Sequence, residues 1–147
     1  MAYKFRCTCP ITSALDVLGD KWILVLIKQM LMEGKRTFKD FVESEEAIST
    51  NILSAKLKLL EDTGMVTKSK LPNNKKTNIY TLTEKAIALA PVIVELALWS
   101  DRHLRDIHPS IDDGENLALL REDKGVFTRM LVTQYQTKEN DHGSTED

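Results

Sequence analysis

The segment Ile48–Gly64, with the sequence ISTNILSAKLKLLEDTG, decides the predicted fold. Ser49 is placed to cap the N-terminus of a helix, and Gly64 stands just past its last turn. Ile48 and Leu53 have the spacing of a hydrophobic staple across the same cap. One side of this helix is apolar, whereas the other side is small, polar and basic. The segment therefore predicts an amphipathic helix that docks on a core by one face and leaves the other face free.

The free face of this helix carries side chains that suit a DNA major groove. At about 100° per residue, three leucines fall on the docking face, namely Leu53, Leu57 and Leu60. The candidate base-contacting residues lie opposite them: Asn51, Ser54, Ala55 and Lys58, with Thr50 at the margin. Asparagine can pair with adenine, alanine can touch a thymine methyl group, and serine can donate to a base or a phosphate. Most helices with one polar face are only solvated, so the surrounding elements must support this interpretation.

Three helices are predicted ahead of this segment, over residues 12–18, 21–33 and 38–43. Gly19 closes the first helix, Asp20 can cap the second, and Gly34 ends the second. The second helix is apolar around most of its circumference, which predicts that it is largely buried. The segment 48–64 is therefore expected to be the last helix of a compact helical core.

After Gly64 the apolar period changes from helical to extended, which predicts two strands over residues 65–71 and 78–82. The residues between them, PNNKKT, form the expected hairpin tip, where Pro72 and two asparagines supply turn chemistry. Helices followed by such a hairpin make a winged helix-turn-helix, a mainly α fold with a small antiparallel β wing. In that fold the last core helix fits the major groove and the wing reaches neighbouring phosphates.

Basic residues around the helix and the hairpin are the candidate phosphate contacts. They are Lys35 and Arg36 ahead of the third helix, Lys56 on the helix, and Lys75 and Lys76 at the hairpin tip. The backbone N–H groups that follow Ser49 offer a further anion site. Such contacts add affinity and salt dependence but read no sequence. Two lysines at a hairpin tip are often only solubilising, so the order of the elements carries the interpretation.

The C-terminal half is predicted to consist of two long helices and a tail. Residues 84–105 form a helix whose middle, AIALAPVIVELALW, is apolar on nearly every face, which predicts burial against another chain. Pro91 removes one backbone hydrogen bond and is expected to bend this helix. A further helix is predicted over residues 115–136, weakened near Gly125, and the polar tail 138–147 is expected to be flexible.

Charge and composition limit the classes of function that this protein can have. The net charge of −2 argues weakly against nucleic-acid binding, but residues 35–76 hold nine Lys or Arg against six Asp or Glu, whereas residues 101–147 hold six against eleven. Two ordinary solvated surfaces would explain this distribution as well. No apolar run is long enough for a transmembrane helix, and the N-terminus lacks the apolar core of a signal peptide, so a cytoplasmic protein is expected.

Several spaced motifs resemble the HxlR-type family of bacterial winged helix-turn-helix transcriptional regulators. They are CPITSALDVLGDKW from Cys9 to Trp22, ISTNILSAKLKLLEDTGMV, IYTLTEKA and WSDRH. The resemblance covers residues 7–105 and implies a homodimer on a near-palindromic operator, with 1–105 as the DNA-binding domain and 84–105 as its dimerisation helix. Residues 106–137 are then a C-terminal extension. The sequence departs from the family pattern at Thr37, Ala55 and Ala86.

Cys7 and Cys9 are the only cysteines, and their spacing is tighter than the CxxC pattern of metal and dithiol sites. No histidine lies nearby, so no metal site is predicted, and no cofactor is expected. Cys9 precedes a helix, whose dipole lowers the pKa of a thiol from about 8.5. The resemblance implies that a cysteine at this position can sense oxidants or electrophiles. The alternatives are a partly buried Cys9 that only packs as a small apolar residue, and a small-molecule effector near Trp22 and Trp99.

Two other classes of function compete with a DNA-binding regulator. An enzyme is the weaker one, because the sequence holds no glycine-rich phosphate loop, no nucleophile elbow and no plausible catalytic triad. A winged helix used only as a protein–protein assembly module is the stronger rival. Direct binding to DNA with a clear salt dependence separates that rival from a regulator.

Overall fold

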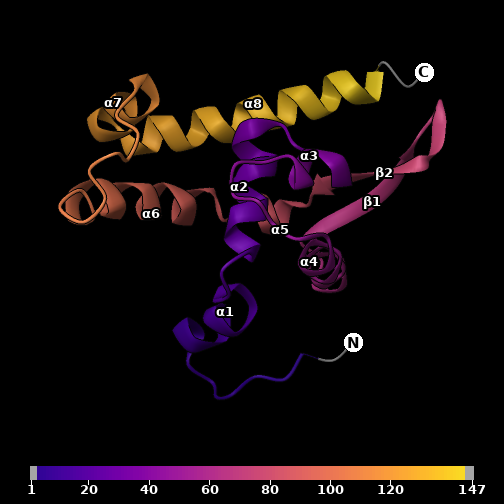
Figure 1. Ribbon diagram of the computed structural model, residues 1–147, viewed down its shortest axis with the longest axis horizontal. Helices are drawn as coiled ribbons and strands as arrows, with labels where there is room; N and C mark the ends of the chain where they lie inside the picture. The colour runs from indigo at the N-terminus through magenta and orange to yellow at the C-terminus, as the bar shows by residue number, and fades with distance from the viewer. Residues whose placement is uncertain (1–2, 145–147) are drawn as a thin grey trace. The chain divides into compact units, whose positions relative to one another are not determined.

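A computed structural model describes residues 3–144 of the chain, with side chains described through residue 141. The chain forms two compact units, Met1–Ala86 and Ile87–Asp147. The first unit contains α1 (Pro10–Leu18), α2 (Ile23–Glu33), α3 (Phe38–Val42), α4 (Thr50–Asp62), β1 (Val66–Leu71) and β2 (Asn74–Leu82), as Figure 1 shows. This mainly helical arrangement with one two-stranded antiparallel sheet confirms the predicted fold class.

The core of the first unit is built on α2 and on one face of α4. Helix α2 buries six side chains, and Leu26 and Ile27 are fully inaccessible to solvent. Helix α4 is anchored by the three predicted leucines Leu53, Leu57 and Leu60, none of which is more than 3% exposed. Each buried leucine contributes about 1.5–3 kcal/mol relative to an exposed one. Helix α4 packs against α3 and β1, so its position is fixed from two sides.

Both ends of α4 are held as the sequence predicts. The Ser49 hydroxyl accepts a hydrogen bond from the Ile52 backbone N–H at 3.4 Å. Gly64 follows the helix with a φ of +76°, a left-handed conformation that favours glycine. The Thr83 hydroxyl donates to the Gly64 carbonyl at 2.7 Å, and the Lys85 ammonium donates to the Thr63 carbonyl at 2.7 Å. The two carbonyls that follow α4 are thereby tied to the segment after β2.

The turn between α3 and α4 contains a left-handed backbone conformation that no sequence pattern predicts. Ala47 has a φ of +57°, the only positive φ at a non-glycine residue in the part of the chain that the structure describes. The neighbouring Glu46 is held by Gln29, whose Nε2 donates to a Glu46 carboxylate oxygen at 2.8 Å, and by an ion pair with Lys28. Gln29 is itself only 1% exposed. This contact ties the turn to α2 and thereby maintains the left-handed alanine.

We expect Ala47→Gly to raise the free energy of unfolding of the first unit by about 1 kcal/mol, because glycine removes the steric cost of the left-handed conformation. Chemical denaturation of the purified protein measures this change. Ala55→Gly is the matched control, since Ala55 lies in the exposed face of α4 with ordinary helical geometry and its replacement should lower stability by about 1 kcal/mol. Equal destabilisation by the two substitutions would show that the turn is not strained.

The single bent helix predicted over residues 84–105 is wrong. The structure has two helices there, α5 (Glu84–Ile87) and α6 (Ala90–His103). Pro91 lies in the first turn of α6, where backbone N–H groups have no partner within the helix. The N–H that proline lacks is therefore not needed there. In a continuous helix the same proline would clash with the carbonyl of Ile87. The chain therefore restarts at Pro91 rather than bending around it.

The single helix predicted over residues 115–136 is also two helices in the structure, α7 (Glu115–Glu122) and α8 (Lys124–Ser144). Asp123 separates them with an extended backbone, and its carboxylate accepts a hydrogen bond from the Val126 N–H at 3.1 Å. An N-terminal cap at Asp123 explains why the break precedes Gly125, where the sequence indicates weakness. Helix α8 continues to Ser144, beyond the expected end near residue 136 and into the predicted tail. Residues 145–147 of that tail lie outside the described residues.

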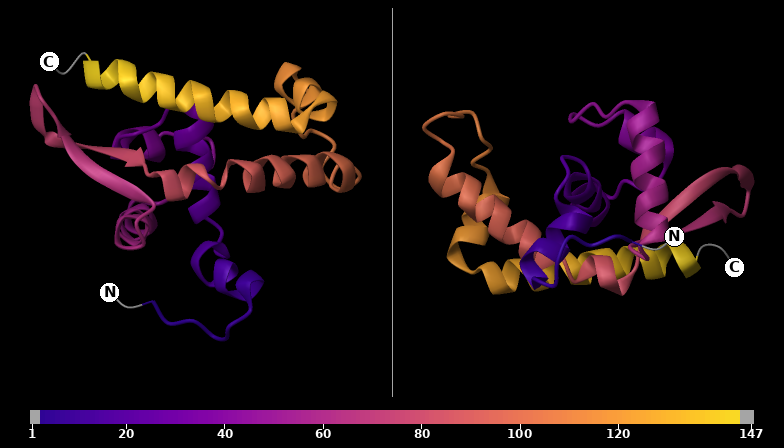
Figure 2. Two further views of the ribbon diagram at one scale, coloured as in Figure 1. Left: turned by 180° about the vertical axis from the view of Figure 1, so that it is seen from behind. Right: turned by 90° about the horizontal axis from the view of Figure 1, so that it is seen from below.

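Helices α6, α7 and α8 share one apolar cluster, and the views in Figure 2 show α7 and α8 lying against α6. The cluster consists of Val94, Leu98, Leu120, Phe127 and Leu131. The chain's own C-terminal helices thus cover one face of α6, which the sequence assigns entirely to another chain. A second apolar stripe on α6 stays in solvent, with Val92, Leu96 and Trp99 exposed by 41%, 48% and 55%.

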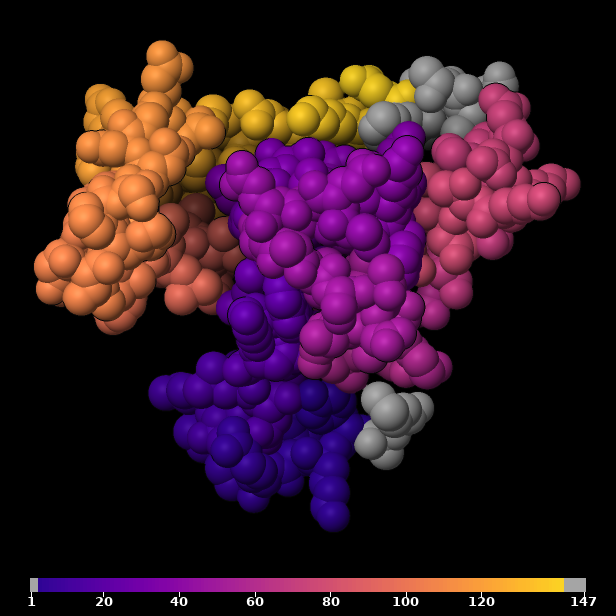
Figure 3. All heavy atoms as spheres, in the orientation of Figure 1, coloured from indigo at the N-terminus to yellow at the C-terminus, as the bar shows by residue number. Residues whose placement is uncertain are grey.

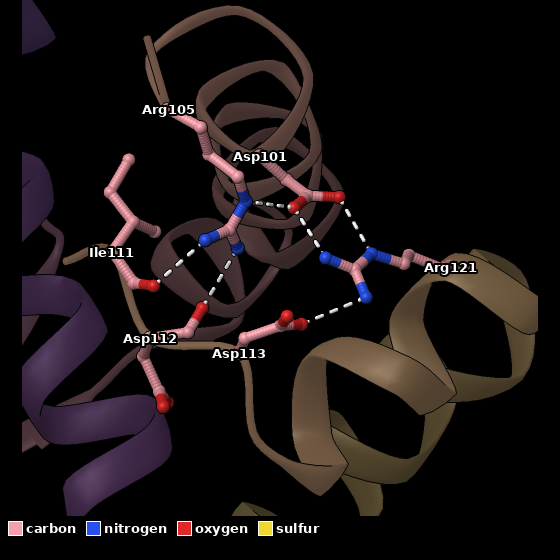
Figure 4. Close-up of polar contacts among 6 residues, drawn as sticks. All are labelled: Asp101, Arg105, Ile111, Asp112, Asp113 and Arg121. Carbon is pink, nitrogen blue, oxygen red and sulfur yellow. Dashed lines mark hydrogen bonds and ion pairs between the residues drawn. The ribbon is translucent and has the colours of Figure 1, made fainter. Parts of the chain in front are cut away.

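An ion network joins α6, the following loop and α7 (Figure 4). Asp101 accepts hydrogen bonds from Arg121 at 2.6 and 2.8 Å and from Arg105 at 2.8 Å. Arg105 also donates to the carbonyls of Ile111 and Asp112, which fixes the loop. The pKa of Asp101 is held well below its usual range, first by Arg121 and then by Arg105. The side chain of Asp101 retains only 10% of its exposure, so solvent screens these contacts poorly.

We expect Asp101→Asn to lower the melting temperature of the protein at neutral pH. The lowered pKa means that the folded state holds the Asp101 proton less tightly than the unfolded chain does. The ionised Asp101 therefore stabilises the folded state fully above about pH 3.9, the pKa of an aspartate in the unfolded chain. This stabilisation declines as the pH falls towards the pKa that Asp101 has in the folded state. Thermal denaturation at pH 7 and below pH 4 measures this, and the gap between wild type and variant should narrow in acid. Asp106→Asn, at an exposed position, should change little at either pH.

Candidate DNA-binding interface

The outward face of α4 has the exposure that the sequence predicts. Thr50, Asn51, Ser54, Ala55 and Lys58 are all exposed, on the side opposite the buried leucines. Ser49 is exposed as well, at the N-cap of the helix. The Lys58 side chain is 77% exposed and only loosely paired with Asp62, at 3.8 Å. The face therefore presents an amide, hydroxyls and a methyl group near its N-terminal end, with one available ammonium group further along.

Lys56 differs from the other predicted contacts because it already has a partner. Its ammonium group lies 2.7 Å from the carboxylate of Asp20, and the Lys56 side chain is 25% exposed. Burial acts to raise the pKa of Asp20, but Lys56 and the backbone N–H groups of Ile23 and Trp22 outweigh it and lower that pKa. The same carboxylate caps α2 through those two N–H groups, at 2.7 and 2.8 Å. Lys56 therefore joins α4 to the start of α2.

The wing differs from the predicted hairpin in where it turns. The sequence places residues 72–77 in the tip, but β2 begins at Asn74 and the turn comprises only Pro72 and Asn73. The register pairs Leu71 with Asn74 and Lys70 with Asn78, so residues 75–77 form a bulge in β2. Lys75 and Lys76 lie on this bulge beside the turn.

Asn74 organises the bulge with both ends of its side chain. Its Oδ1 accepts from the Lys76 backbone N–H at 3.1 Å, and its Nδ2 donates to the Thr77 hydroxyl at 2.9 Å. The ammonium groups of Lys75 and Lys76 point into solvent from exposed residues. In the space-filling view of Figure 3, the wing projects beyond the helices of its own unit. The asparagine, which the sequence marks only as a turn former, therefore fixes the two lysines at a protruding edge.

Lys35 and Arg36 are less available than the wing lysines, because both are half-buried. The Arg36 carbonyl accepts from the Tyr80 N–H at 2.8 Å, and the Arg36 N–H donates to Asp40 at 3.0 Å. Burial acts to raise the pKa of Asp40, but the backbone N–H groups of Arg36 and Thr37 lower it overall. The backbone of this link thus joins α3 to the base of the wing.

Two grooves separate the wing from the helices of the first unit. One, of about 610 Å³, lies between α3, Thr50 at the start of α4 and the bulge of β2. The other, of about 340 Å³, lies between α4 and the strands and is lined by Ser54 and Lys58 together with Lys68 and Tyr80. Lys39, Lys68, Thr77 and Asn78 are among the groove-lining residues that the sequence reasoning missed. Strand alternation could have identified Lys68, because it shares a face with the buried Val66.

Phe38, Asn78 and Tyr80 line both grooves and form their common wall. Burial raises the pKa of Tyr80, with a smaller contribution from Glu61, while a hydrogen bond with Asn78 opposes the shift. Among the described residues, the buried Asn78 Oδ1 has no hydrogen-bond partner. A buried acceptor without a partner is costly, so this oxygen is a strained point of the wall.

Cys9 is exposed and forms the N-cap of α1, which contradicts the alternative that it is a partly buried packing residue. The pKa of its thiol is lowered, first by the Thr12 backbone N–H, then by the Thr12 side chain and the Ile11 N–H. These groups lie at the N-terminus of α1 and stabilise a negative charge on the sulfur, so they favour the thiolate. Helix α1 buries none of its residues, and Ile11 and Leu15 are exposed by 72% and 54%.

Across the described residues, no His, Cys, Asp and Glu side chains cluster in a way that could hold a metal ion. No helix in the same part of the chain is long and apolar enough to cross a membrane.

Comparison with known proteins places residues 17–108 in a family described as HxlR-like helix-turn-helix. The chain is 39% identical over 95 residues to the HTH-type transcriptional regulator YodB of Bacillus subtilis, a match that covers 64% of this chain and 84% of that protein. The structure of reduced YodB covers 66% of this chain and 95% of its own, with 38% identity and a TM-score of 0.53. YodB has also been solved bound to quinone and after treatment with diamide.

Two further structures have the same fold. The redox regulator HypR in its reduced form is 28% identical, covers 70% of this chain and all of its own, and gives a TM-score of 0.56. PA1607, described as a putative transcription factor, is 30% identical, covers 67% of each chain and gives a TM-score of 0.60. The family match ends at residue 108, so α7 and α8 lie outside it, as do Cys7 and Cys9. With a family profile that spans well over half of its length, this chain belongs to the HxlR-like helix-turn-helix family of transcriptional regulators.

Proposed function

We propose that this regulator binds double-stranded DNA in a sequence-specific manner, as a homodimer on a near-palindromic operator. The observation that carries the proposal is the exposed polar face of α4 beside a protruding wing whose edge holds two exposed lysines. Membership of a helix-turn-helix family supports the same function. In this arrangement α4 enters the major groove and the wing contacts the adjacent phosphates.

The two parts of the interface have different tasks. Asn51 offers a donor and an acceptor to an adenine edge, and Ala55 offers a methyl group to a thymine. Lys75 and Lys76 contact phosphates, with Lys58 as a further ammonium close to the groove. Lys56 is a weaker candidate because its pairing with Asp20 must be broken first. Lys35 and Arg36 are likewise secondary, since both side chains are half-buried.

A second copy of the chain explains two apolar surfaces that one chain leaves exposed. Val92, Leu96 and Trp99 form a stripe along α6, and Ile11 and Leu15 form another on α1. Contiguous apolar stripes on helices mark contact surfaces in soluble proteins. A symmetric dimer formed through them would present two α4 helices to successive major grooves, about 34 Å apart.

The DNA proposal predicts different effects for the wing and the helix. Combined Lys75→Ala and Lys76→Ala should weaken binding to all duplexes about equally and reduce the salt slope by about one per lysine lost. Asn51→Ala should instead cost about 1–3 kcal/mol on the preferred duplex and relax discrimination at one base pair. Selection from random duplexes, followed by titration at several salt concentrations, measures both. An unchanged sequence preference in Asn51→Ala would remove that residue from base recognition.

The dimer proposal predicts that Leu96→Asp raises the dimer dissociation constant by roughly 100-fold, because symmetry buries the charge twice at about 1–3 kcal/mol each. Analytical ultracentrifugation measures this change. Val126→Asp is the matched control, since Val126 is 43% exposed on α8, outside both apolar stripes. If the Leu96 variant dimerises as well as the control, the α6 stripe is not the interface.

The competing function is a winged helix that serves only as a protein assembly module. The net charge of −2 is the observation that favours it. A selection that recovers no preferred duplex, together with binding that lacks salt dependence, would support this alternative and exclude the regulator.

We infer that modification of the Cys9 thiol switches DNA affinity. Cys9 is exposed at a helix N-terminus, and its lowered pKa favours the reactive thiolate. YodB has been solved in reduced, quinone-bound and diamide-treated states, and HypR in reduced and oxidised states. A small-molecule effector near Trp22 and Trp99 stays an alternative hypothesis.

The switch predicts that Cys9→Ser binds its DNA normally under reducing conditions and no longer responds to a thiol oxidant. In a Cys7→Ser protein, the rate of Cys9 alkylation should follow the titration of a thiol whose pKa is lowered, so the midpoint of the rate against pH should lie below that of an unperturbed cysteine in a model peptide. The rate measured against pH checks this. Oxidant-treated wild-type protein that keeps its DNA affinity would exclude Cys9 as the trigger.

A further inference from the structure

Two thiols, rather than one, lie at the start of α1. Cys7 and Cys9 are the only cysteines in the sequence, and both are exposed. A disulfide formed from these cysteines joins Cys7 to Cys9 within one chain, or joins one of them to a cysteine of a second copy. No third cysteine is present in the sequence to resolve an oxidised Cys9 from another element.

Ser13 holds the backbone of both cysteines over the first turn of α1. Its N–H donates to the Cys9 carbonyl at 2.9 Å, and its hydroxyl donates to the Cys7 carbonyl at 3.5 Å. The backbone bends at Thr8, between the two cysteines. The segment that carries the thiols is therefore folded back on the helix.

The residues before Cys7 are anchored on the same helix at Asp16. The Arg6 guanidinium donates to the Asp16 carboxylate at 2.5 Å, and the Arg6 backbone N–H donates to it at 3.2 Å. The Tyr3 hydroxyl donates to the Asp16 carbonyl at 2.5 Å. These contacts hold the backbone before Cys7 against α1, so Cys7 stays at the same end of the helix as Cys9, two residues away in the sequence. A second thiol tethered this close has a high effective concentration at the first.

We propose that Cys7 is the resolving thiol for Cys9, so that the two form a reversible disulfide within one chain when a two-electron oxidant reacts. The proposal rests on the assignment of Cys9 as the switch and adds its chemical outcome. It distinguishes a self-contained dithiol from a disulfide that links two copies and from a lasting adduct on Cys9.

The reaction balances with an oxidant of the diazene class, such as diamide. The Cys9 thiolate adds to one nitrogen of the N=N bond, and the other nitrogen takes a proton. The Cys7 thiolate then attacks the Cys9 sulfur, the S–N bond breaks, and the departing nitrogen takes the second proton. The two thiols lose two electrons and two protons, and the diazene becomes a hydrazine.

The tight spacing favours a labile bond over a structural one. Closing a disulfide across a single residue forces the backbone away from relaxed disulfide geometry, and strained disulfides are more easily reduced. The closure also changes the conformation of Cys9, which is the N-cap of α1. Because α1 carries the exposed Ile11 and Leu15 of the proposed dimer contact, the bond would alter that surface directly.

Peptide mass spectrometry of the full-length protein tests the bond itself. Tryptic cleavage after Arg6 and Lys21 places both cysteines in one peptide, residues 7–21. After diamide treatment and blocking of free thiols, we expect this peptide to be two hydrogens lighter and unblocked, and the protein to run as a single chain without reductant. A covalent dimer, or a peptide that keeps a free Cys7, would overturn the proposal.

Titration of the selected DNA duplex tests the role of Cys7 separately from that of Cys9. Diamide should weaken the wild-type affinity on the order of tenfold, dithiothreitol should restore it, and Cys7→Ser should lose that reversible change. Cys9→Ser should be insensitive. If Cys7→Ser responds like wild type while Cys9→Ser does not, the dithiol is excluded and the Cys9 switch stands. If diamide weakens DNA binding of both variants as much as that of wild type, the Cys9 switch itself fails. The same holds if diamide does not change the DNA affinity of wild type.

Discussion

The burial of one face of α4 is the constraint on which the first unit depends. Leu53, Leu57 and Leu60 lose almost all their exposure, and together they contribute several kcal/mol to a core shared with α2, α3 and β1. Their 3.6-residue spacing leaves the opposite face of the same helix in solvent. The exposed surface that carries Asn51 is thus a direct consequence of the docking that holds the unit together.

The contacts at both ends of α4 fix the position of its exposed surface. Gln29 and Glu46 fix the turn that leads into the helix, and Thr83 and Lys85 close the other end. On the wing, Asn74 holds the bulge that carries the lysines. Interfaces that read DNA need this kind of rigidity, because a hydrogen bond to a base edge tolerates little displacement.

In the second unit, helices outside the family match pack on a helix that lies within it. Family similarity ends at residue 108, yet α7 and α8 bury Val94 and Leu98 on α6 through a shared apolar cluster. Asp101 links α6 to α7 through two arginines at the end of the same cluster. The extension therefore leaves α6 with a single exposed stripe, and any partner of that helix must use the stripe or its edges.

The sequence by itself determined the order of the elements in the first unit, the buried and free faces of α4 and its two caps, because these follow from local periodicity and capping chemistry. It left open whether Cys9 is exposed or partly buried, and the structure decided this. The sequence could not place the breaks at Pro91 and Asp123, because a helix can bend or restart at such residues and packing decides between the two. The left-handed Ala47, the pairing of Lys56 with Asp20 and the bulge held by Asn74 depend on contacts between elements. The covering of α6 by its own C-terminal helices likewise requires residues distant in sequence to meet, which only the tertiary structure decided.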